Sequence, residues 1–127
     1  MIEKPHLPAD LDEERVIVIN KTIFDLCIRC IDNIRQNLCA QLHCKDSELK
    51  SIIQQNDILK EEVYDLIIDA EKECKKKILQ EQKISASHMI TCSVIYRSSI
   101  SYTNSMEQMD QKRMQKLAEL GLMDDKE

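Results

Sequence analysis

The sequence predicts an elongated all-α protein, either a helical hairpin or a coiled-coil bundle of two to three long helices. Its 127 residues include one Gly and two Pro, the residues that most often turn a chain between short elements, so few and long elements are expected. It has one Phe, three Tyr and no Trp, which leaves few large aromatic side chains to anchor a compact core. The charged residues (32%) and hydrophobic residues (43%) together suit amphipathic helices.

The expected compartment follows from the lack of a signal-peptide pattern and of a membrane-spanning run in the sequence. Residues 1–9 contain Pro5 and Pro8 but no hydrophobic region of a signal peptide, and they are expected to form a disordered lead. No run reaches the roughly 18 apolar residues of a membrane span. We therefore expect an intracellular protein of a reducing compartment, cytoplasm or nucleus, with no membrane insertion.

Net charge argues against nucleic-acid binding. The formal net charge is −5, and acidic and basic residues are mixed along the chain. The run Lys75, Lys76, Lys77 is flanked by Glu71 and Glu73, as on a solvated helix face. Because nucleic-acid affinity depends on clustered cations, no nucleic-acid partner is expected.

Residues 10–44 are predicted to form the first amphipathic helix. Asp10 and Glu13 match a capping box in its aspartate form, and Asp12, Glu13 and Glu14 place negative charge in the first turn. The apolar residues that then recur at steps of three and four are Phe24, Cys27, Ile31, Ile34 and Leu38. This spacing is typical of a bundle helix with one buried face.

Residues 47–83 carry the strongest pattern, a heptad seam with one polar member. Asp46 or Ser47 offers a new N-cap after the first helix, which favours an antiparallel hairpin, although one continuous rod stays open. A lone Asn in such a seam can fix register and partner number. The predicted partner-binding seam consists of Leu49, Ile52, Asn56, Leu59, Val63, Leu66 and Ala70.

Residues 84–121 form a Ser/Thr-rich segment of low charge followed by an amphipathic helix. Between Ile84 and Met106 the only formally charged residue is Arg97, and nine residues are Ser or Thr. For residues 91–103 the spacing fits both a helix and a strand; helix is favoured because a lone strand would leave unpaired edges. Gly121 is expected to end the last helix, before an acidic tail of residues 122–127. The predicted partner contacts here are Cys92, Ile95, Tyr102 and Met106.

The six cysteines support two interpretations. Inside apolar helical patterns, free Cys behaves as a small buried hydrophobic residue, and this interpretation is preferred. The alternative is a metal or redox site, which would use thiols and one imidazole from the first helix. Its candidate ligands are Cys27, Cys30, Cys39, His43 and Cys44.

No catalytic motif is apparent, so the sequence predicts a protein that is not an enzyme. His6, His43 and His88 lie apart, without an evident acid or nucleophile partner. We expect no cofactor and no small-molecule substrate. The leading hypothesis is a structural or scaffold subunit of a multiprotein helical assembly, which binds helical protein partners or self-associates as an oligomer. The alternative hypothesis is a metal- or redox-responsive helical protein.

Overall fold

Helices make up the secondary structure of the computed structural model, which describes residues 11–123. The five helices of this range are α1 (Glu13–Leu42), α2 (Asp46–Gln55), α3 (Asp57–Glu81), α4 (Ala86–Tyr96) and α5 (Ile100–Glu119). The prediction of an all-α protein is therefore confirmed. Two to three long helices were predicted, whereas the architecture is a five-helix bundle that is not clearly a hairpin of long helices or a coiled coil.

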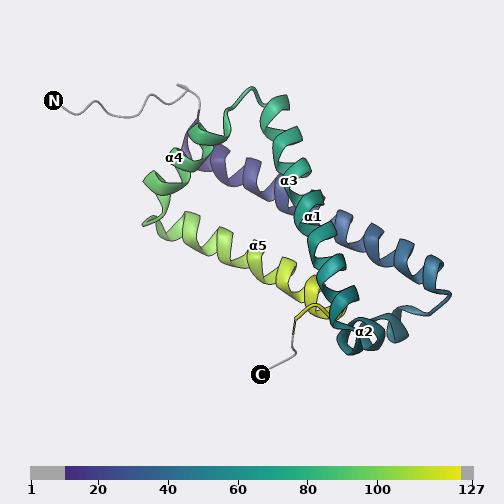
Figure 1. Cartoon of the computed structure of the whole chain (residues 1–127). Helices are drawn as coiled ribbons and strands as arrows, with labels where there is room; N and C mark the ends of the chain where they lie inside the picture. Colours follow the sequence, from purple (N-terminus) through teal and green to yellow (C-terminus); the bar gives the residue numbers. More distant parts are fainter. Residues whose placement is uncertain (1–10, 124–127) are drawn as a thin grey trace.

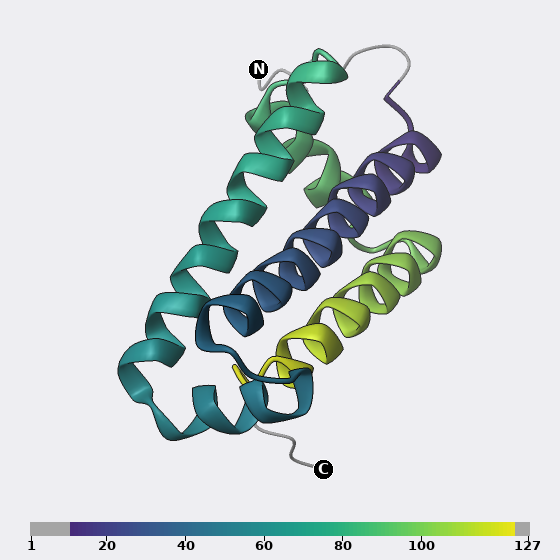
Figure 2. The same ribbon diagram turned by 90° about the vertical axis from the view of Figure 1, so that its right-hand side faces the viewer.

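Helix α1 is the central element of the bundle. It packs against α2, α3, α4 and α5. In Figure 1, α3 crosses α1 and α5 runs below it. Figure 2 shows α3, α1 and α5 side by side, with α2 at one end of the bundle and α4 at the other. Helices α1 and α3 run antiparallel, as the predicted hairpin requires.

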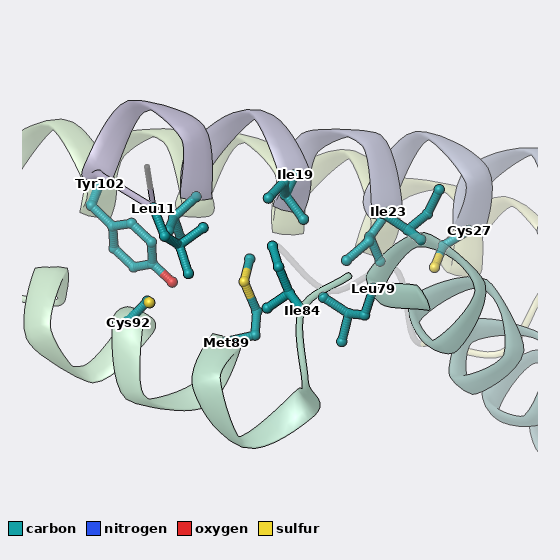
Figure 3. Packing of buried hydrophobic residues seen from close by; sticks show 11 residues of the cluster. Leu11, Ile19, Ile23, Cys27, Leu79, Ile84, Met89, Cys92 and Tyr102 are labelled. Atoms are coloured by element: carbon teal, nitrogen blue, oxygen red, sulfur yellow. The ribbon is translucent and has the colours of Figure 1, made fainter. Parts of the chain in front are cut away.

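Two hydrophobic clusters divide the core along α1. The first joins the N-terminal half of α1 to the end of α3, to α4 and to the start of α5 (Figure 3). Its buried members are Leu11, Val16, Ile19, Ile23, Cys27, Ile78, Leu79, Ile84, Met89, Cys92 and Tyr102. The second cluster joins the C-terminal half of α1 to α2, the start of α3 and the end of α5. Its buried members are Ile31, Leu38, Leu49, Ile53, Val63, Ile67, Leu117, Leu120 and Leu122.

Side-chain caps explain where the helices begin. The N-cap of α1 is Asp12, whose Oδ1 accepts a hydrogen bond from the Arg15 amide at 2.9 Å. The predicted cap Asp10 lies outside the described residues. At the start of α2 the N-cap is Lys45 rather than Asp46 or Ser47, and the Glu48 carboxylate accepts a hydrogen bond from the Lys45 amide at 2.9 Å.

The predicted single helix over residues 47–83 is interrupted at Asn56. This residue has an extended backbone (φ −127°, ψ 99°), and its Oδ1 accepts a hydrogen bond from the Leu59 amide at 3.1 Å. Asn competes with helical hydrogen bonding in this way because its short side chain reaches nearby amides. A residue predicted to set coiled-coil register is therefore the N-cap of α3.

Two further turns, at His43 and before Ser99, decide between the alternatives that the sequence left open. His43 adopts a left-handed conformation (φ 53°) at the end of α1, which turns the chain and excludes the continuous rod. Residues 84–121 form two helices, because Ser99 Oγ caps α5 by accepting from the Tyr102 amide at 3.4 Å. Residues 91–103 thus include no strand, and helix was the favoured prediction.

Gly121 ends α5 as predicted, and its lack of a side chain is required. Its φ is +91°, and an added Cβ would lie 2.6 Å from the Lys50 carbonyl oxygen of α2. The amides of Gly121 and Leu122 donate to the carbonyls of Ala118 and Leu117, both at 3.0 Å, which is a Schellman motif. The backbone after α5 therefore approaches that of α2 closely at Gly121.

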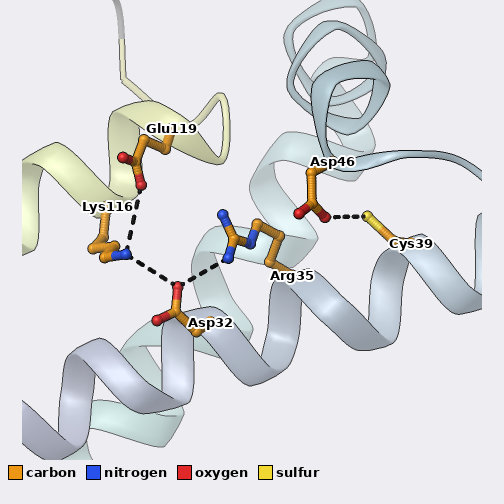
Figure 4. A network of polar contacts seen from close by, with 6 residues as sticks. All are labelled: Asp32, Arg35, Cys39, Asp46, Lys116 and Glu119. Carbon is orange, nitrogen blue, oxygen red and sulfur yellow. Dashed lines mark hydrogen bonds and ion pairs between the residues drawn. The ribbon is translucent and has the colours of Figure 1, made fainter.

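Polar contacts join α1 to α5 at the periphery of this end. Asp32 of α1 lies 3.4 Å from Arg35 and 3.5 Å from Lys116 of α5, and Lys116 is 3.7 Å from Glu119 (Figure 4). These side chains are all partly exposed to solvent, so the network contributes little to stability compared with the apolar clusters.

Candidate functional site

The predicted seam from Leu49 to Ala70 does not form one exposed surface. Leu49 and Val63 are 1% exposed and belong to the second core cluster. Ile52, Leu59 and Ala70 are partly buried, while Asn56 is the exposed cap between α2 and α3. Only Leu66, at 52% exposure, is an apolar member of the seam that faces solvent. Most of this pattern is therefore used within the molecule.

The residues predicted for partner contact in 84–121 also divide between core and surface. Cys92 and Tyr102 are buried in the first core cluster, and Met106 packs against it. Ile95 is 46% exposed. Cys92, Tyr102 and Met106 therefore attach α4 and α5 to the bundle. Ile95 remains on the surface.

The outer side of α4 presents an apolar surface. Ile90, Val94 and Ile95 are 57%, 56% and 46% exposed, whereas Met89 and Cys92 are buried on the opposite side of the helix. We call Ile90, Val94 and Ile95 the α4 outer face. Ile100, the first residue of α5, is 78% exposed and follows α4 after a short turn. Sequence reasoning identified Ile95 alone of these four, although the low charge of this segment was the signal that could have found the others.

A groove lies between α3 and α5, with α1 as its floor. Its volume is about 400 Å³, and the apolar side chains of Ile23, Phe24 and Ile68 line it. Arg113 of α5 and Glu71 of α3 form a half-buried ion pair at the groove, with Arg113 Nη2 2.7 Å from Glu71 Oε1. These two charges satisfy each other, so neither is left to bind a ligand of opposite charge.

Two of the candidate cysteines, Cys27 and Cys30, lie near a third cysteine, Cys74, that was not a candidate. Cys27 is buried, and the Sγ atoms of Cys30 on α1 and Cys74 on α3 lie 3.3 Å apart. Burial and the nearby Glu71 carboxylate raise the pKa of the Cys27 thiol to about 12. Burial and the hydrogen bond with Cys30 raise the pKa of the Cys74 thiol to about 11. Cys74 was not among the candidate ligands, because sequence spacing does not reveal which residue of α3 faces α1.

The remaining candidates lie at the far end of α1. Cys39 Sγ donates a hydrogen bond to Asp46 Oδ1 at 3.3 Å (Figure 4), and burial together with this contact raises the pKa of the Cys39 thiol to about 11. His43 is exposed at the turn. Twelve helical residues, about 18 Å along the axis, separate Cys27 from Cys39. The five candidate ligands therefore do not meet at one place.

Two further findings limit the classes of site. Within residues 11–123, no group of three or more His, Cys, Asp or Glu side chains is arranged to hold a metal ion. In the same range, no helix has the length and apolar character needed to cross a membrane.

Comparison with known proteins gives no match: no family model, no curated protein and no solved structure is similar to this chain. We therefore infer the function from the α4 outer face and the groove between α3 and α5.

Proposed function

We propose that this protein is a non-enzymatic interaction subunit of a helical protein assembly, and that it binds a helix of a partner protein through the α4 outer face. The observation that carries the proposal is the exposure of Ile90, Val94 and Ile95 on a helix whose other side is already buried.

Helix α4 has apolar side chains around most of its circumference. A helix with this distribution is usually covered on more than one side, whereas a surface helix keeps a polar outer side. The bundle covers the side that carries Met89 and Cys92. A partner that covers Ile90 and Val94 would remove the remaining apolar surface from water, which is the main favourable term in protein association.

The composition of the surrounding surface favours an apolar helix as the partner. Arg97 is the only formally charged residue between Ile84 and Met106, so few charges would lose hydration on contact. Helix α4 has 11 residues, a length of about 16 Å, which suits contact with three or four turns of a partner helix. Residues at steps of four, such as Ile90 and Val94, are the usual anchors of such contacts.

The proposed binding surface differs from the one that the sequence predicted. Partner helices remain the expected ligands, but the contact is assigned to α4 rather than to a coiled-coil seam in residues 47–83. All six cysteines are unpaired in the structure, which supports a reducing compartment, cytoplasm or nucleus.

The test is quantitative co-purification of the tagged full-length protein from its native cells under reducing conditions. The variant combines Ile90→Asp with Val94→Asp, and the matched control is Ile58→Asp. Ile58 is 72% exposed near the start of α3, at the end of the bundle away from α4. We expect the amount of partner chain that co-purifies with the double variant to fall at least about tenfold. Burying a charge in an apolar interface costs more than about 1.4 kcal/mol of binding free energy, which corresponds to this factor. The control should retain them.

A photoreactive amino acid at Val94 identifies what covers the face. Crosslinks to an amphipathic helical segment of another chain would support the proposal. Crosslinks to a second copy of this chain, together with the mass of an oligomer by light scattering, would show that the face serves self-association and would contradict a partner protein. Equal co-purification of the double variant and the wild type would refute the assignment to α4.

A further inference from the structure

The contact between Cys30 and Cys74 joins two long helices through a pair of thiols. Cys30 lies on α1 and Cys74 on α3, 44 positions apart in sequence, and their Sγ atoms are separated by 3.3 Å. A disulfide has a sulfur–sulfur length of about 2.05 Å, so the two sulfur atoms need to approach by about 1.2 Å. Rotation of the two side chains supplies this small movement, because the helices already lie side by side (Figure 2).

The pair is partly exposed to solvent, unlike the buried thiol of Cys27. Cys30 and Cys74 line a surface pocket of about 550 Å³, whose wall includes Lys76 and Lys77. Cys27 is only 5% exposed and belongs to the first core cluster. A small oxidant therefore has access to Cys30 and Cys74 before it has access to Cys27.

We propose that Cys30 and Cys74 are a redox-active dithiol, which a hydroperoxide converts into a disulfide between α1 and α3. One thiolate attacks the peroxide oxygen, which breaks the O–O bond and gives a sulfenic acid and hydroxide. The second thiolate attacks that sulfenic sulfur and displaces its oxygen as hydroxide, which is protonated to water. With hydrogen peroxide, two thiols lose two electrons and two protons, and two molecules of water are formed.

The surroundings of the pair influence the rate of this reaction. The pKa of the Cys74 thiol is raised to about 11, mainly by burial, while the positive charge of Lys77 acts in the opposite direction. Since the thiolate is the reactive form, little of Cys74 reacts directly with peroxide near neutral pH. Because both steps of the reaction need a thiolate, we expect the crosslink to form faster as pH rises.

The disulfide would fasten α3 to the central helix. Closing a loop of 44 residues lowers the conformational entropy of the unfolded chain, and the expected rise in Tm is on the order of 10 °C. The crosslink also holds together the walls of the surface pocket. It does not involve α4, so the dithiol is independent of the proposed partner-binding face.

The test uses the reduced full-length protein, freed of reductant and treated with a small molar excess of hydrogen peroxide. Peptide mapping without reduction should show a peptide of α1 joined to a peptide of α3 through Cys30 and Cys74, and Tm should rise and return on reduction. In Cys74→Ser the crosslink should be absent, and Cys30 should be trapped as sulfenic acid by dimedone. The matched control Cys39→Ser should form the crosslink as the wild type does.

Three results would overturn the proposal. The first is a peptide map in which both thiols stay free while other cysteines are oxidised. The second is a bond from Cys30 to Cys27 or to another chain, and the third is a bond between Cys39 and Cys44 as the first product. Circular dichroism of each variant verifies that it is folded, and Cys30→Ser provides a second variant that should also lack the crosslink.

Discussion

Four thiols with raised pKa values, those of Cys27, Cys39, Cys74 and Cys92, link the stability of this fold to alkaline pH. The pKa is raised to about 12 for Cys27 and to about 11 for Cys39 and Cys74, in each case mainly by burial. The ordinary thiol value is 9.0, so above that pH the unfolded chain releases protons that the folded chain retains. The unfolded state then binds fewer protons, and the free energy of unfolding falls as pH rises. The stabilising effect is fully present below about pH 9.

We expect the free energy of unfolding, measured by urea titration with a phosphine reductant, to decrease from pH 8.5 to pH 10.5. Each such thiol contributes a slope of up to about 1.4 kcal/mol per pH unit. Cys27→Ala removes one of them, so its slope should be shallower by about this amount, although its stability at pH 7 is also lower. Equal slopes for the two proteins would contradict a protonated, buried Cys27.

Individual residues also show what the heptad pattern could not reveal. The seam prediction included Leu66 and Ile52 but not Ile67 and Ile53, which are 1% and 0% exposed. A run of adjacent apolar residues fits more than one helical face. The neighbouring helices decide which face is buried, and their positions are not encoded in the local spacing.

At the scale of the elements, capping side chains decided the boundaries that hydrophobic spacing missed. Asn56, Ser85 and Ser99 each accept a hydrogen bond from an amide three residues later. Such caps are visible in the sequence only as single polar residues, and the apolar pattern continues across Asn56. Gly121 was predicted correctly because a Gly after the last apolar turn has one common structural role.

The N-cap of α3 provides a test at this scale. Asn56→Ala removes the acceptor for the Leu59 amide, and we expect it to lower the free energy of unfolding by about 1 kcal/mol. The measurement is urea unfolding followed by circular dichroism. Gln54→Ala, an exposed change in the last turn of α2, should have an effect below about 0.5 kcal/mol. If Asn56→Ala were as stable as Gln54→Ala, the break between α2 and α3 would not depend on this cap.

At the scale of the whole molecule, the chain builds its own core around α1. The sequence predicted the amphipathic first helix and the antiparallel return, and both are present. It did not predict that α5 would pack beside α1, because residues 91–103, which include the start of α5, carried competing helix and strand patterns. It also assigned Val63 of α3 to a partner, whereas this residue is covered by the protein itself.

A pair of adjacent residues in α3 distinguishes an intramolecular bundle from an intermolecular seam. Ile67 is 1% exposed in the second core cluster, and Leu66 is 52% exposed. In the isolated protein, we expect Ile67→Ala to lower the free energy of unfolding by about 2–5 kcal/mol, because it leaves a cavity in the core. Leu66→Ala should cost less than about 1 kcal/mol. Chemical unfolding at several protein concentrations measures both effects. A larger loss for Leu66→Ala, together with a concentration-dependent midpoint, would show that the seam and not the bundle core carries the stability of α3.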